Sequence, residues 1–372
     1  MSEQVIKPDL NFVNDIIASG GESLKKCYQC STCTVVCNVT PDSKPFPRKE
    51  MMYAQWGLKD KLLSNPDVWL CHQCSDCTAH CPRGAKPGEV LGAVRKMTIR
   101  EYSPVGPLAA MVGDPKYLLF LFALPVLIFL GITMMLGTLT APLRGENGGI
   151  VYANFIPVPY IDAVFVAAAS FAALCFALGI RNYWKAMSGG KSLDGNLVES
   201  IKVTVADILA HKRFKECNVA KERSTAHLLV FYSFAGLAVT TTWAIVYLYG
   251  FHWESPYPLY DPMKILGNIS AAALLIGITL VTSNRLKNAE KAGKGSYFDW
   301  LFITVIFVIV LTGIGAQVFR LADIGLLAYP TYFVHLVFVF FLFAYAPFSK
   351  MAHMVYRTTA MVFAKHTARE GK

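Results

Sequence analysis

Two cysteine-rich stretches decide the fold of the amino-terminal part of the chain: residues 27–37 (CYQCSTCTVVC) and residues 71–82 (CHQCSDCTAHCP). Each stretch carries four cysteines with the spacing C-x2-C-x2-C-x3-C, which is the spacing of proteins that hold two [4Fe–4S] clusters. Three thiolates this close together can wrap one cubane, and the fourth usually reaches the other cluster. We therefore expect one cluster on Cys27, Cys30, Cys33 and Cys81, and a second cluster on Cys71, Cys74, Cys77 and Cys37.

Zinc sites and disulfides explain this pattern less well. A zinc site needs only four thiolates, and each stretch already holds four. Disulfides are rare on the cytoplasmic side of a membrane, where the charge distribution described below places these cysteines. Cys37 is followed by Asn38 instead of proline, which affects the expected loop geometry and not the ligation. Cys175 and Cys217 lie outside both stretches and are not expected to be ligands.

The rest of the chain is strongly apolar. Of the 372 residues, 54% are hydrophobic and only 16% are charged, whereas soluble domains have about 25% charged residues. Six windows lack Asp, Glu, Lys and Arg over at least 18 residues, which is enough for a helix to cross a bilayer. These windows are 117–143, 163–180, 228–253, 265–284, 300–319 and 324–349. The sequence therefore predicts a cysteine-rich domain over residues 1–114 and a domain of six transmembrane helices over residues 115–372.

The basic residues indicate how this membrane domain is oriented. Eighteen of them lie in the loops between the second and third helices and the fourth and fifth helices, and after the sixth helix; the opposite loops hold few, among them Arg144 and Arg320. The positive-inside rule then predicts a multi-pass protein of the inner (cytoplasmic) membrane, with the cysteine domain and the carboxyl terminus in the cytoplasm. The net charge of +10 reports this topology and not nucleic-acid binding. Residues 1–10 show no signal peptide, and residues 201–214 are amphipathic enough to lie on the membrane surface.

Histidines in the apolar half are candidate haem ligands, because ionisable residues inside a membrane are costly and usually functional. His335 and His353 are 18 residues apart, which is five turns of helix and places both on one face. We expect two b-type haems along this helix, with His227 opposite His353 and His252 as the partner of His335.

Three alternatives to this haem arrangement remain open at the level of sequence. His211 competes with His252, although a solvated loop position explains His211 better. His335 can be a hydrogen-bonded structural residue, which would leave a single haem. A membrane half without haem would simply anchor the iron–sulfur domain.

Several motifs resemble known families of electron-transfer proteins. Residues 24–96, with CYQCSTCTVVCN, FPRKEMM, WGLKDKLL and WLCHQCSDCTAHCPRG, resemble the C subunit of heterodisulfide reductase. The segment between the two cysteine stretches, residues 48–70, is predicted to be helical. The resemblance implies an α-helical ferredoxin fold with two clusters that relay electrons. The membrane half resembles the cytochrome b subunits of nitrate reductase (gamma) and heterodisulfide reductase (E). The nitrate reductase pattern places a second histidine deeper in the equivalent of the third helix, where this chain has FAGLAVTT (residues 234–241) and no histidine.

The combination of the two halves resembles the C subunits of quinone-interacting membrane-bound oxidoreductase complexes of sulfate reducers. The resemblance implies a mainly α fold, soluble flavin/iron–sulfur partner subunits, menaquinone as substrate and electron delivery toward adenylylsulfate reductase. No nucleotide-binding motif is present, so we expect no complete active site for a soluble substrate and no catalytic residue in this chain. The rival expectations are a sulfite-reductase-linked or heterodisulfide-reductase-type membrane subunit.

Overall fold

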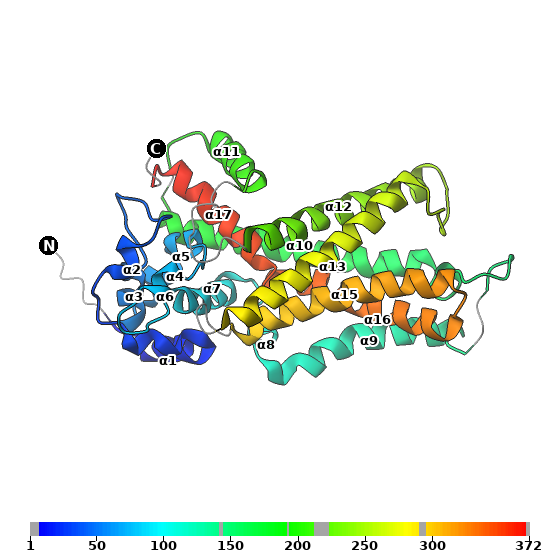
Figure 1. The fold of residues 1–372 in the computed structure, drawn as a ribbon, viewed down its shortest axis with the longest axis horizontal. Helices are drawn as coiled ribbons and strands as arrows, with labels where there is room; N and C mark the ends of the chain where they lie inside the picture. Colours follow the sequence, from blue (N-terminus) through cyan, green and yellow to red (C-terminus); the bar gives the residue numbers. More distant parts are fainter. Residues whose placement is uncertain (1–6, 141–143, 192, 212–222, 290–294, 370–372) are drawn as a thin grey trace.

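Helices are the only regular elements among the residues that the computed structural model describes, which are 7–140, 144–191, 193–211, 223–289 and 295–369. Short helices gather at one end of the molecule, and long helices form a bundle that extends away from them (Figure 1). The first and last helices, α1 and α17, both lie at the end with the short helices (Figure 1). The predicted mainly α fold is confirmed.

The short helices surround the two cysteine stretches. They are α1 (Leu10–Ile16), α2 (Thr32–Val35), α3 (Arg48–Gln55), α4 (Lys59–Leu63), α5 (Asp67–Leu70), α6 (Asp76–Ala79) and α7 (Pro87–Tyr102). Helix α7 lies at the centre of this group, and its Leu91 and Val94 are buried against α3, α4 and α5.

The segment between the cysteine stretches is helical, as its sequence predicted, but it forms three short helices instead of one. Gly57 ends α3 with φ of +62°, a backbone conformation that favours glycine, and a Cβ at this position would lie 2.6 Å from the carbonyl oxygen of Asp9. Pro66 then begins a new turn before α5.

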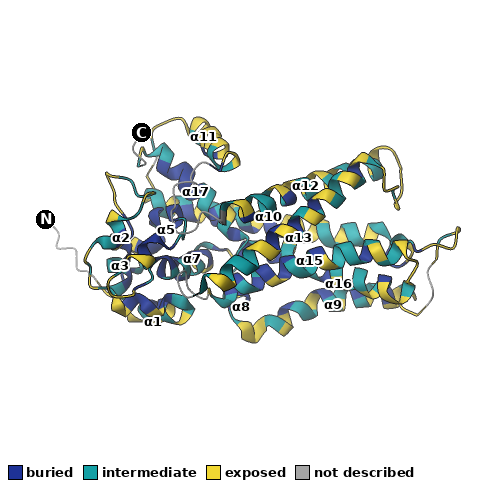
Figure 2. Ribbon diagram, in the orientation of Figure 1, coloured by how far each residue is buried: buried dark blue, intermediate teal, exposed yellow. Residues whose placement is uncertain are grey.

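Six helices are long and apolar enough to cross a membrane, and the prediction of a multi-pass membrane protein is confirmed at that level. The bundle consists of α9 (Leu118–Met135), α10 (Val158–Ser188), α12 (Arg223–Gly250), α13 (Pro262–Lys287), α15 (Tyr297–Leu321) and α16 (Gly325–Ala344). A short helix, α8 (Gly106–Val112), leads into it. Fully buried residues concentrate around the short helices, whereas the outer faces of the bundle are exposed (Figure 2), as expected for helices that face lipid.

The sixth apolar window does not form one straight helix. Helix α16 ends at Ala344, and a 3-10 turn at Ala346–Phe348 with Pro347 separates it from α17 (Ala352–His366). Proline lacks the N–H that a continuous helix needs, so the chain changes direction here. The prediction that His335 and His353 share one helical face is therefore wrong, because the two residues lie on different helices.

Helix α17 packs on the short-helix end instead of continuing through the bundle. It contacts α5, α7 and α10, and also α11 (Leu197–Leu209). The amphipathic segment predicted over residues 201–214 is this helix α11, which begins earlier than expected; residues 212–214 lie outside the described residues. One continuous hydrophobic core joins Trp69 of α5 to Tyr356 and Ala360 of α17. The two parts of the sequence therefore share a core.

Small residues bring α12 and α13 close together. A Cβ on Gly236 would lie 2.2 Å from Ser270 Oγ, and a Cβ on Gly277 would lie 3.0 Å from the backbone nitrogen of Val230. Small residues let the backbones of membrane helices approach closely, and this is a usual way in which such helices associate. The hydrophobic effect does not drive the association, because lipid tails are as apolar as the helix side chains.

The variant Gly236→Leu tests this packing. The added side chain overlaps Ser270, so we expect a loss of about 1–3 kcal/mol in stability and a lower midpoint of thermal unfolding in detergent. Gly131→Leu in α9 is the matched control, since a Cβ there meets no atom within 4 Å. Equal midpoints for the two variants would contradict the close approach of α12 and α13.

Candidate metal centres

The two cysteine stretches adopt the same local structure. Gln29 and Ser31 in the first stretch, like Gln73 and Ser75 in the second, have positive φ angles, and a short helix follows each pair. These left-handed residues turn the backbone sharply at the same two positions in both stretches. The short helices α2 and α6 pack against each other, which places the two stretches side by side.

The fold mixes cysteines from the two stretches. Burial, followed by negative charge on Cys27, Cys30 and Cys81, raises the pKa of the Cys33 thiol to about 11. The second group behaves in the same way: burial raises the pKa of Cys37 to about 12, and its thiol neighbours are Cys71 and Cys74 of the other stretch. Burial, followed by the influence of Cys71, Cys74 and Cys37, also raises the pKa of Cys77.

Each last cysteine thus lies near cysteines of the opposite stretch, and the two ligand sets remain a prediction. Within the described part of the chain, no three His, Cys, Asp or Glu side chains come together tightly enough to ligate one metal ion. The side chains grouped here are thiols, and thiolates are the ligands that hold [4Fe–4S] clusters.

Backbone and side-chain amides support both groups of thiols. The N–H of Gln73 donates to Cys71 Sγ, and the N–H of Ala85 donates to Cys81 Sγ, each over 3.3 Å. In the first stretch, Gln55 Nε2 donates to the carbonyl of Cys27 over 2.6 Å and thereby holds the loop to α3. Hydrogen bonds to cluster ligands are one means by which proteins set a reduction potential.

His353, at the start of α17, has the properties of a metal ligand. Its Nδ1 is shielded from solvent and has no hydrogen-bond partner in the described structure. Burial lowers the pKa of His353 well below its usual range, and the positive charges of Arg95, Lys350, Arg357 and His227 lower it further. The imidazole is therefore neutral near pH 7, which is the form that binds a metal.

His211 lies in a different environment from the solvated loop that the sequence indicated. It is buried at the end of α11, and its ring centroid lies 5.4 Å from that of His227 and 4.9 Å from that of Phe231. The prediction of a solvated residue is wrong because the segment that carries His211 folds back against α12. His227 and His211 therefore both lie near the α17 end of the bundle, on the same side as His353.

His335 and His252 have contrasting positions. His335 lies inside α16, and its Nδ1 is 3.1 Å from both Thr312 Oγ1 and the carbonyl oxygen of Ile309. A hydrogen bond on Nδ1 leaves Nε2 free to bind a metal, as second-shell partners of metal ligands usually do. His252 is exposed beyond the end of α12, with φ of +55°, and no hydrogen bond or ring contact in the described structure joins it to His335. Their pairing remains a prediction.

Of the two remaining cysteines, Cys175 is buried within α10, as expected for a small apolar residue, and Cys217 lies outside the described residues.

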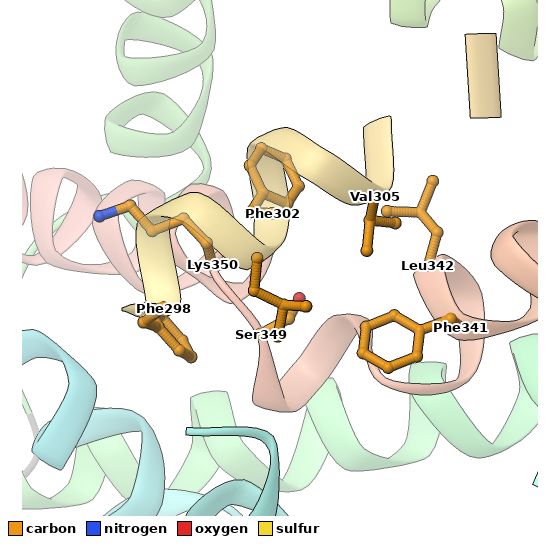
Figure 3. A pocket seen from close by; sticks show the side chains of 8 residues that line it. Phe298, Phe302, Val305, Phe341, Leu342, Ser349 and Lys350 are labelled. Atoms are coloured by element: carbon orange, nitrogen blue, oxygen red, sulfur yellow. The ribbon is translucent and has the colours of Figure 1, made fainter. Parts of the chain in front are cut away.

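A small apolar cavity lies between α15 and α16, near the short-helix end of the bundle (Figure 3). Phe302, Val305 and Phe341 line it, and Ser349 and Lys350 form its edge. The Lys350 ammonium is 2.8 Å from a carboxylate oxygen of Asp299, so it is already part of an ion pair.

A buried ionic network ties Arg369 to α3 and α5, between the two cysteine stretches. Arg369 donates from Nε to one carboxylate oxygen of Asp67 over 2.8 Å and from Nη2 to the other over 2.5 Å. Lys49 is 3.1 Å from the same carboxylate, and Asn65 donates to the buried carboxylate of Glu50 over 2.8 Å. Sequence reasoning missed these residues, because the pairing joins positions 302 residues apart.

Comparisons with known proteins divide the chain in the same way as the structure. The 4Fe–4S dicluster domain family matches residues 23–85, and the citrate utilization protein B family matches residues 111–371. The first match supports [4Fe–4S] clusters in the cysteine-rich domain. No solved structure matches the chain.

Individual relatives agree with these matches. The chain is 39% identical to the C subunit of the H(2):CoB-CoM heterodisulfide,ferredoxin reductase of Methanothermobacter marburgensis over 90 residues, 23% of this chain and 47% of that protein. It therefore spans about half the length of the heterodisulfide reductase relatives. It is 26% identical to citrate utilization protein B of Escherichia coli over 371 residues, 94% of this chain and 92% of that protein.

The fold, the cysteine arrangement and these matches define a membrane-embedded iron–sulfur protein that is related to the C subunit of heterodisulfide reductase and suited to electron transfer. The chain belongs to the citrate utilization protein B family.

Glu50→Gln tests the buried network through its pH dependence. Burial raises the pKa of Glu50 from 4.5 to about 7, although Lys49 opposes the change. The folded chain then binds this proton more tightly than the unfolded chain, so the stabilisation is complete below about pH 4.5 and is lost as the pH rises through about 7. We expect the unfolding midpoint of Glu50→Gln to fall less steeply between about pH 4.5 and about pH 7 than the midpoint of the unmodified chain.

The measurement is thermal unfolding in detergent between pH 5 and pH 8. Glu101→Gln is the matched control, since Glu101 is an exposed residue of α7 in an ion pair with Lys59. An unchanged slope in Glu50→Gln would show that Glu50 is not the titrating group.

Proposed function

We propose that this chain is the membrane subunit of a respiratory oxidoreductase complex that exchanges electrons between menaquinone and soluble flavin/iron–sulfur subunits through haem b and two [4Fe–4S] clusters. The observation that carries the proposal is the position of His353: this half-buried imidazole, whose Nδ1 is shielded from solvent, packs against Trp69 of the helix that leads directly to Cys71. A site for a membrane cofactor and a site for a cluster are thereby adjacent.

The cluster ligands proposed here are Cys27, Cys30, Cys33 and Cys81 for one cluster, and Cys71, Cys74, Cys77 and Cys37 for the other. The exchange of the last cysteine between stretches supports this assignment. Each cluster carries one electron at a time when loaded, so the chain itself needs no catalytic residue.

The residues near His353 fit a haem. Two histidines on separate helices are the usual axial ligands of a b-type haem, and the orphaned Nδ1 of His353 is a buried polar atom that needs a partner. We propose His353 and His227 for this site, with His211 as the alternative to His227 because both rings lie together. A haem here supplies one-electron transfer within the membrane.

A second haem on His335, with His252 as its partner, is a separate proposal with weaker support. The hydrogen bonds on His335 Nδ1 fit an oriented ligand. The exposed position of His252 requires that the segment after α12 fold inward to reach it.

The proposed location is the inner (cytoplasmic) membrane, with the iron–sulfur domain (residues 1–114) and the carboxyl terminus in the cytoplasm and with residues 115–372 as the membrane domain. The short-helix end of the bundle supports this orientation, because Arg285, Lys350 and Arg357 all lie there.

The identity of the soluble partner depends on which of two similar groups of proteins shares its function with this chain. A complex of the quinone-interacting type leads toward adenylylsulfate reduction. The alignment with citrate utilization protein B over nearly the whole chain favours a second candidate, in which the partner acts in the use of citrate or a similar acid. Mass spectrometry of proteins co-purified with the tagged chain distinguishes the two.

The first experiment is a reduced-minus-oxidised optical spectrum of the detergent-purified chain, with haem and iron quantified per polypeptide. About eight non-haem irons and one or two haems b support the proposal, and two haems support the His335 site. Eight irons without haem would leave a membrane anchor and remove the quinone reaction.

His353→Ala tests the haem ligand directly. We expect it to lose at least half of the bound haem while retaining the iron, because the axial bond is lost and the cysteines are untouched. His366→Ala, at the other end of α17, is the matched control and retains both. Full haem content in His353→Ala would exclude His353 as a ligand.

A further inference from the structure

The carbonyl group of Cys71 accepts hydrogen bonds from two arginines on different helices. Arg95 of α7 donates from Nη2 to the Cys71 carbonyl over 2.5 Å and from Nε to the Val68 carbonyl over 2.8 Å. Arg357 of α17 donates to the Cys71 carbonyl over 3.0 Å. Two positively charged guanidinium groups are therefore hydrogen-bonded to the backbone of one proposed cluster ligand.

One of these two charges, that of Arg95, is shielded from water, and Arg357 is partly buried. Arg95 is only 3% exposed, and its guanidinium lies 5.8 Å from the ring centroid of the fully buried Trp69. Trp69 in turn stacks on Tyr356, with ring centroids 5.5 Å apart and an interplanar angle of 21°. His353 is another neighbour of the indole ring, with ring centroids again 5.5 Å apart.

The arginines near the other group of cysteines are exposed to solvent. Arg48 donates to the carbonyl of Gln29, and Arg83 lies 5.7 Å from the ring centroid of Tyr28. Tyr28 is 58% exposed and Cys30 is also at the surface, so water and salt screen these charges. The two cluster sites thus differ in electrostatic environment although their loops have the same sequence pattern.

Reduction of a [4Fe–4S] cluster adds one electron and no proton, so its charge becomes more negative by one. Fixed positive charge in a poorly solvated site stabilises this extra electron far more than the same charge at the surface. Net charge, hydrogen bonds and solvent exposure are the usual determinants of a cluster potential, and of these the nearby positive charge of Arg95 and Arg357 favours reduction at the site of Cys71.

We propose that Arg95 and Arg357 are positioning residues that raise the reduction potential of the cluster on Cys71, Cys74, Cys77 and Cys37 above that of the other cluster, so that an electron shared by the two clusters resides next to His353. The proposal rests on the two-cluster assignment made above, and it does not require a haem.

The test is a redox titration of the purified full chain, monitored by the electron paramagnetic resonance signals of the reduced clusters. Cys74→Ser and Cys30→Ser assign the signals, because a serine ligand changes the spectrum of its own cluster. We expect the signal that Cys74→Ser alters to appear at the higher potential.

Arg357→Gln is the main variant, since this arginine is only partly buried and its loss leaves Arg95 in place. We expect a decrease of at least tenfold in the equilibrium constant for reduction of the Cys71 cluster, which is 59 mV for one electron, with less than threefold change at the other cluster. Arg95→Lys keeps the charge and gives a smaller shift. Arg83→Gln is the matched control and leaves the Cys71 cluster unchanged.

The outcomes separate this proposal from the proposed function. If Arg357→Gln retains eight irons but shifts neither potential, or shifts both equally, the arginines only hold helices together and the proposal is overturned. A lower potential at the Cys71 cluster in the unmodified chain overturns it as well. Failure to find haem would contradict the quinone-linked function while leaving the order of the cluster potentials intact.

Discussion

The docking of α17 on α5 is the contact on which the rest of the structure depends. Asp67, the first residue of α5, is fully buried, and its charge is compensated by Arg369 from the end of the chain and by Lys49. Removal of one partner from a buried ion pair typically costs about 3–5 kcal/mol, because a buried charge is left unpaired. These ion pairs therefore fix the position of α5 relative to α17, and Cys71, which directly follows α5, is held with it.

This contact makes one functional unit out of two segments that are far apart in the sequence. The amino-terminal part supplies the thiols, and the carboxyl-terminal part supplies His353 and Arg357 against the same short helix. The core around Trp69 is continuous across the junction. A cluster and a membrane cofactor exchange electrons only over short distances, so a rigid junction of this kind serves the proposed function better than a flexible linker.

Local patterns in the sequence predicted what local chemistry controls. The spacing of the cysteines predicted [4Fe–4S] clusters, and the match to the 4Fe–4S dicluster domain family supports them. The apolar windows predicted six membrane helices, because length and hydrophobicity alone determine whether a helix spans a bilayer. Predictions that depended on where the chain turns were less successful. Residues 48–70 form three helices instead of one, and the sixth apolar window is interrupted near Pro347 instead of forming one straight helix. His211, expected in solvent, is buried beside His227.

The sequence by itself determined the class of cofactor, the membrane character and the helical fold, since each follows from residue type and spacing along the chain. Only the tertiary structure decided which residues surround each site. Arg95, Arg357 and Trp69 have no motif that marks them, and their roles arise because α5, α7 and α17 meet at one point. Buried charges and aromatic contacts depend on distances between segments that the sequence separates by hundreds of residues, and folding alone brings these segments together.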